Sequence, residues 1–107
     1  MSPIVPRFAA DEVKAPTLRD RLSRAIGITL DQAGMSRADT AAAISVWVGS
    51  SVSKGMLDCY ASPAREQNAI SALRLLALVA VTGDARTLNL LLEDAGLIVV
   101  DRKYEAL

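Results

Sequence analysis

Few side chains in this 107-residue sequence could carry catalytic chemistry. The sequence contains no histidine and a single cysteine, Cys59. A Ser-His-Asp or Cys-His arrangement therefore cannot be built, because no imidazole is present to take the proton. The same composition excludes a zinc site of the usual Cys/His kind and an intramolecular disulfide. With no glycine-rich phosphate loop either, we expect neither an enzyme nor a protein that needs a cofactor or a metal.

A different chemistry is available around a break of small residues, VGSSVSKG at positions 48–55. The hydroxyls of Ser51 and Ser53 can donate and accept hydrogen bonds, and Lys54 adds a positive charge. Serines are also common in turns and at helix starts, and a surface lysine is ordinary. The break is therefore either a connector or the turn that aims the next helix at a partner.

The charged residues are balanced, with 12 Lys and Arg against 12 Asp and Glu. This neutrality argues neither for nor against a polyanionic partner, because the distribution of charge matters more than its total. The length and the 51% hydrophobic content are typical of one domain with a genuine core. We expect an extended or mobile N-terminal arm at 1–16, which is rich in proline, and a folded domain at 17–107.

Helical periodicity, capping residues and terminal glycines predict a mostly α fold of about five helices. The predicted helices lie between these starts and stops: Thr17 to Gly34, Ser36 to Gly49, Ser53 to Pro63, Ile70 to Gly83, and Asp84 to Gly96.

Three apolar features indicate how these helices pack. The helix at 70–83 is apolar almost all round, with Leu73 and Leu76 on its main stripe, so we expect it to be central and buried from several sides. Trp47 lies off the stripe of its helix, and we expect it at an edge of the core or, as the alternative, in a subunit contact. Leu90 is also off its stripe, and we expect a second subunit to cover it.

The run from Leu97 to Val100 is apolar and β-branched, which predicts a short C-terminal β-strand. We find no second strand in the sequence to pair with it. The same strand from another copy would satisfy its backbone groups and form an antiparallel ribbon across a twofold axis. The predicted dimer interface therefore comprises Leu90, Leu97, Ile98, Val99 and Val100.

The longest strongly apolar stretch, 75–81, is far shorter than the roughly 20 residues of a membrane helix. The first residues show no charged leader followed by an apolar run. We therefore expect a cytoplasmic protein with no membrane partner.

The order of the helices resembles the helix-turn-helix domain of phage repressors and related bacterial regulators. The residues that carry the resemblance are Ser36-Arg37-Ala38-Asp39, Ser45-x-x-x-Gly49, Val52-Ser53 and Leu57. In that family a small residue four positions before the turn glycine permits the tight helix crossing, and Ser45 fits. The turn departs from the pattern by about two extra residues between Gly49 and Val52. Residues 36–104 look more specifically like small regulators of transposable bacteriophages and prophages.

The resemblance implies a transcriptional regulator that binds double-stranded DNA as a homodimer. The helix that starts at Ser53 would then enter the major groove. Asp58 would be repelled by phosphates unless its carboxylate accepts a hydrogen bond from a cytosine amino group. Gly55 is a poor helix former, which indicates that a packing neighbour or DNA comes close to its backbone. The implied DNA-binding residues are Arg37, Ser51, Ser53, Lys54, Gly55, Asp58 and Arg65.

An alternative function is a small helical interaction module that binds a host or phage regulatory protein. Such a module would use the helix face around Leu90 or the edge of the strand at 97–100. A contiguous basic face that joins Arg37, Lys54 and Arg65 would favour DNA. Divergence of these three side chains would favour the interaction module.

Overall fold

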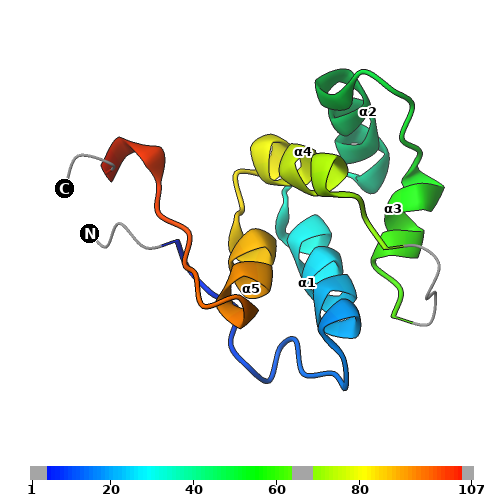
Figure 1. The fold of residues 1–107 in the computed structure, drawn as a ribbon. Coiled ribbons are helices and arrows are strands. Elements are labelled where there is room, and N and C mark those ends of the chain that lie inside the picture. Colours follow the sequence, from blue (N-terminus) through cyan, green and yellow to red (C-terminus); the bar gives the residue numbers. More distant parts are fainter. Residues whose placement is uncertain (1–4, 64–68, 105–107) are drawn as a thin grey trace.

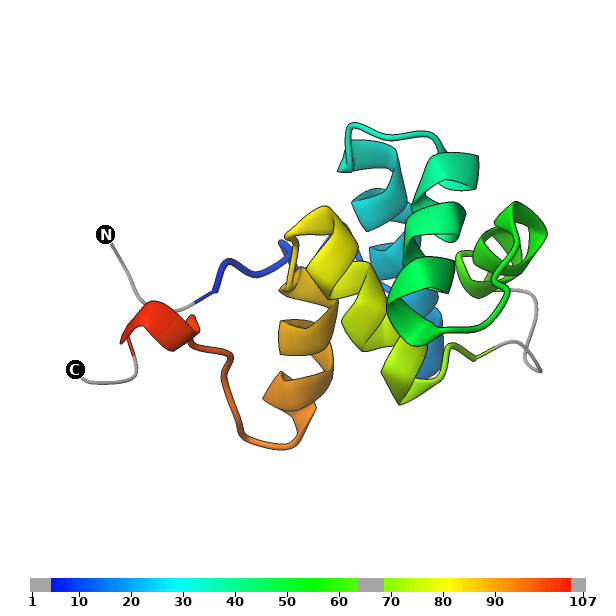
Figure 2. The same cartoon turned by 90° about the horizontal axis from the view of Figure 1, so that it is seen from above.

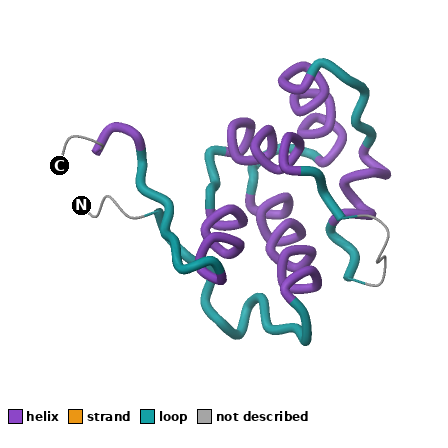
Figure 3. The backbone as a smooth tube through the Cα atoms, viewed as in Figure 1, coloured by secondary structure: helices purple, strands orange, loops and turns teal. Residues whose placement is uncertain are grey.

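The computed structural model describes residues 5–63 and 69–104. Within them the chain is mostly helical and contains no β-strand (Figures 1 and 3). Among the residues in these two ranges, no helix is long and apolar enough to cross a membrane. The elements are α1 (Leu18–Gln32), α2 (Arg37–Val48), α3 (Lys54–Tyr60), α4 (Ala72–Thr82), α5 (Arg86–Asp94) and the 3-10 turn η1 (Arg102–Tyr104).

Local hydrogen bonds explain where the first four helices begin and end. The predicted capping residues Thr17, Ser36 and Ser53 each accept, through the side-chain oxygen, a hydrogen bond of 3.0–3.1 Å from the backbone N–H three residues later. Gly49 and Gly83 end α2 and α4 with φ of 76° and 71°, a left-handed conformation that favours glycine. The predicted positions of these caps and stops are confirmed.

The main core lies between α1, α2, α3 and α4. In Figure 2, α4 crosses beside α2, and these two helices make the most extensive contact between elements. Small residues such as Ala41 and Ala77 are fully buried, which lets the backbones approach closely. The buried apolar residues of this core are Ile26, Leu30, Ala41, Ile44, Val52, Leu57, Tyr60, Leu75, Ala77 and Leu78.

The prediction that α4 is buried from several sides is wrong. The row formed by Leu75 and Leu78 faces the core, whereas Leu73 and Leu76, on the predicted main stripe, are about half exposed. A helix that is apolar all round has no polar face to indicate which side turns outward. The choice depends on the partners of α4, which are chiefly α2 and α5.

A second, smaller cluster lies beside α1 and α5. Val13 is buried together with Ala25 and Leu90, and Phe8 packs against them. Leu90, which we expected a second subunit to cover, is covered by its own chain. The described part of the predicted arm therefore lies against the helices and contributes to their packing.

The predicted C-terminal strand is not found among the described residues, and both backbone groups of Val99, at its centre, bond within the same chain. The Val5 N–H donates to the Val99 carbonyl oxygen at 3.0 Å. The Asn89 side chain makes the other connection: its amide donates to the Val5 carbonyl at 3.0 Å, and its oxygen accepts from the Val99 N–H at 3.3 Å. The segments near the two ends of the described chain consequently run side by side (Figure 1).

Candidate functional site

The break at 48–55 is an ordered turn that the Ser45 side chain holds together. Its hydroxyl lies 2.8 Å from the Ala41 carbonyl oxygen and 3.0 Å from that of Val52, and it accepts from the Val52 N–H at 2.8 Å. Val52 is buried, so its backbone needs these partners. Ser45 was expected only to be small enough for a tight helix crossing. Its hydroxyl also links α2 to the start of α3.

Helix α3 has one buried and one exposed face. Leu57 and Tyr60 are buried and Met56 packs against the core. The amino end of the helix faces outward, and the exposed residues there are Ser51, Ser53, Lys54 and Gly55. Four of the predicted DNA-binding residues therefore lie together on one accessible surface.

Gly55 has no close neighbour within the described chain. A Cβ atom built on it would meet only the Ser53 hydroxyl oxygen, at 3.8 Å, which is an ordinary van der Waals distance. Its φ is not positive, so its conformation does not require glycine either. Of the two explanations that the sequence allowed for this glycine, a packing neighbour inside the chain finds no support here.

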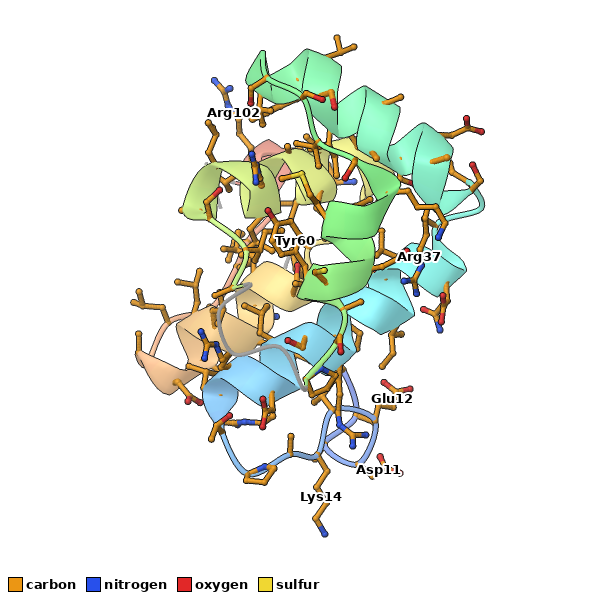
Figure 4. The ribbon with its side chains drawn as sticks, turned by 90° about the vertical axis from the view of Figure 1, so that its right-hand side faces the viewer. Asp11, Glu12, Lys14, Arg37, Tyr60 and Arg102 are labelled. Carbon is orange, nitrogen blue, oxygen red and sulfur yellow. The ribbon has the colours of Figure 1, made fainter. Side chains whose placement is uncertain are left out.

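Four charged side chains meet where α1, α2 and α3 come together (Figure 4). Arg37 donates to Asp58 at 2.9 Å and to Asp31 at 3.1 Å. Lys54 Nζ donates to the other oxygen of Asp58 at 2.7 Å. We call Arg37, Lys54, Asp58 and Asp31 the Asp58 cluster. With two cations and two carboxylates, the cluster is neutral as a whole.

Hydrogen bonds determine the electrostatics of this cluster. The hydrogen bond from Lys54, followed by the one from Arg37, lowers the pKa of Asp58 below its usual value. The hydrogen bond to Asp58 raises the pKa of Arg37. Both residues therefore remain charged at neutral pH, and the carboxylate of Asp58 stays available as an acceptor.

A basic face that joins Arg37, Lys54 and Arg65 would favour DNA, and two of these three residues can be compared. Arg37 and Lys54 do not diverge, because both reach the same carboxylate. Arg65, the third residue, lies outside the described residues. Beside α3, Arg74 donates to the Tyr60 hydroxyl at 2.5 Å and lines a hollow of about 430 Å³ with Ser53 and Gly55. Sequence reasoning missed this pair, because the partners are 14 positions apart in the chain and belong to different helices.

A second hollow, of about 660 Å³, lies between the arm, the tail and the start of α5. Its charged lining includes Asp84 and Arg86, which form an ion pair of 2.8 Å. Arg86 also stacks over the ring of Phe8 and donates to Gln32. Asp84, predicted to cap α5, accepts from the Arg86 N–H at 3.0 Å, although the helix begins only at Arg86. Arg86, at the start of α5, therefore contacts both the arm, through Phe8, and α1, through Gln32.

Among the described residues, no group of three His, Cys, Asp or Glu side chains is placed to hold a metal ion. The surface at the amino end of α3 offers the hydroxyl groups of Ser51 and Ser53, the exposed Lys54, and the backbone of Gly55, which no side chain covers. The function is inferred from this geometry, since no family model, no curated protein and no solved structure matches the chain.

Proposed function

We propose that this protein is a sequence-specific DNA-binding transcriptional regulator of the phage-repressor type, with α3 as its reading helix. In this proposal α3 enters the major groove and α2 crosses the DNA backbone. Ser53 and Lys54, at the amino end of α3, contact phosphates or base edges. Support comes from the turn after α2, which Ser45 ties to the start of α3.

The observation that carries the proposal is the exposed Gly55 within the short helix α3. Glycine weakens a helix, and here neither backbone conformation nor internal packing accounts for it. A residue without a side chain is useful where another molecule must approach the backbone closely. Its neighbours Ser53 and Lys54 are exposed and can donate hydrogen bonds, as DNA phosphates and base edges require.

We further propose that the protein acts as a homodimer, which would present two copies of α3 to two half-sites. The apolar side chains of Leu97, Ile98 and Val100 support this, because they remain exposed in the tail after Val99 has bonded to Val5 and Asn89. Leu90 is left out of the proposed interface, because its own chain covers it.

Gly55→Ala tests the proposed role of α3. Because the added methyl group meets, among the described residues, only the Ser53 hydroxyl oxygen at an ordinary 3.8 Å, the variant should be more stable by about 0.5 kcal/mol. Its affinity for the duplex that the native protein selects from a random-sequence library should fall about tenfold, since the methyl group obstructs close approach. Thermal unfolding and fluorescence anisotropy measure the two effects.

Gly27→Ala is the matched control. Gly27 lies within α1, and a Cβ there would make only ordinary contacts, at 3.8 and 3.9 Å, with Ala61. This variant should gain stability and bind the selected duplex as the native protein does. If the native protein selects no duplex, or if Gly55→Ala binds DNA unchanged, the proposal fails.

The exposed apolar residues favour one other candidate, a module that binds another protein. On α2, Trp47 is half exposed and not in the core, while Leu73 and Leu76 of α4 are also accessible. Exposed large apolar side chains of this kind are typical of interaction surfaces. For this candidate, Trp47→Ala would abolish partner binding and Gly55→Ala would leave it unchanged.

A further inference from the structure

Asp58 occupies an unusual position for an acidic residue on a proposed reading helix. One carboxylate oxygen accepts from Arg37 at 2.9 Å and the other from Lys54 at 2.7 Å. The side chain is 40% exposed, so it lies at the surface that α3 presents to solvent. A single carboxylate thus binds both of the described cations that were expected to contact DNA.

A carboxylate in this position competes with DNA phosphates. Both are oxygen anions that accept hydrogen bonds from arginine and lysine. Non-specific binding to DNA depends on phosphates neutralised by such cations. While Arg37 and Lys54 remain paired with Asp58 and Asp31, the cluster offers no net positive charge to a phosphate, and Asp58 itself repels it.

We infer that Asp58 is a specificity-determining residue that suppresses binding to non-specific DNA, an inference that rests on the proposed function. At a correct site, Lys54 and Arg37 turn to phosphates, and the carboxylate needs a new donor. In the major groove the amino group of cytosine is a suitable donor. At other sequences the carboxylate lacks this donor, and the two cations remain bound to it.

The fold does not depend on Asp58 for the start of α3. Ser53 caps this helix, and Leu57 and Tyr60 anchor it in the core. The ion pairs of Asp58 are partly exposed, and exposed ion pairs contribute little to stability. Asp58→Asn, which keeps the size of the side chain, is therefore a suitable test, and Asp58→Ala separates loss of charge from any contact of the new amide.

The experiment is a salt titration of binding to a labelled random-sequence duplex. Asp58→Asn and Asp58→Ala should both bind about tenfold more tightly than the native protein at low salt, because Lys54 is released and Arg37 keeps only its exposed partner Asp31. The plot of log affinity against log salt should steepen by about 0.9 for each released cation that reaches a phosphate. Circular dichroism verifies that both variants keep the native helix content.

Asp94→Asn is the matched control. It removes the same charge and releases Arg21, whose partner Asp94 lies at 3.2 Å, away from α3. It should change the affinity and the salt slope much less than Asp58→Asn. Equal effects of the two variants would attribute the gain to net charge and overturn the inference.

The remaining outcomes distinguish a failure of this inference from a failure of the proposed function on which it rests. If the native protein binds the duplex and the folded Asp58 variants bind it no more tightly, the inference is overturned and the proposed function stands. Absence of binding by the native protein and by all three variants at low salt would overturn both.

Discussion

Asn89 shows how much one buried side chain contributes to this fold. Beside the direct hydrogen bond from the Val5 N–H to the Val99 carbonyl, its carboxamide bridges the Val5 carbonyl and the Val99 N–H, so that it satisfies one group of each segment. It is fully buried, and burying a polar group without a partner is costly. By contrast, the hydroxyl of Thr87, on the same helix, is buried and has no hydrogen-bond partner in the described chain.

Asn89→Leu should lower the free energy of unfolding by about 2 kcal/mol, because the Val5 carbonyl and the Val99 N–H lose their partner. Thr87→Val, a substitution of similar shape on the same helix, should leave stability unchanged or raise it. Urea denaturation followed by circular dichroism measures both. A loss of stability in Thr87→Val as large as that in Asn89→Leu would contradict the role assigned to the carboxamide.

Among the elements, the link between α2 and α3 depends on one hydroxyl group. The glycine stop after α2 arises from local backbone conformation, whereas the path from Gly49 to Ser53 depends on the bonds between Ser45 and Val52. The residues between Gly49 and Ser53 are thus accommodated while the N–H and the carbonyl of Val52 both have the Ser45 hydroxyl as a partner. The sequence indicated a small residue at position 45 but not this contact, because Val52 lies seven positions away.

Ser45→Ala should destabilise the protein by about 2 kcal/mol, since the buried Val52 N–H is left without a partner. Amide hydrogen exchange at Val52 should accelerate in this variant. Ser50→Ala is the control, because Ser50 lies in the same turn and is exposed, and it should change stability by less than about 0.5 kcal/mol. Slow exchange at Val52 in Ser45→Ala would rule out this account of the turn.

At the scale of the whole molecule, residues before α1 and after α5 complete the bundle. Val13 is buried against Ala25 and Leu90, and Arg7 forms an ion pair of 2.8 Å with Glu93. The two ends of the described chain are therefore connected to each other and to α5. Helix α1 covers one part of Leu90 through Ala25, and Val13 and Phe8 of the arm complete the cluster.

Val13→Ala should reduce the free energy of unfolding by about 2 kcal/mol, because methyl groups are removed from a side chain that is only 4% exposed. Val46→Ala makes the same chemical change on α2, where the side chain is 85% exposed, and should alter stability by less than about 0.5 kcal/mol. Thermal unfolding of the two variants compares them directly. Similar midpoints for Val13→Ala and the native protein would show that the arm contributes nothing to the bundle.

The sequence by itself determined the helical class, the starts of α1, α2 and α3 and the glycine stops of α2 and α4. It could do so because a capping hydroxyl bonds three residues along the chain and a glycine adopts its own left-handed conformation. Only the tertiary structure decided which side of α4 is buried, where Leu90 and Val99 find partners, and that Arg37 and Lys54 meet at Asp58. Most of these contacts join residues far apart in the chain, and periodicity reports only which faces are apolar, not which element covers them.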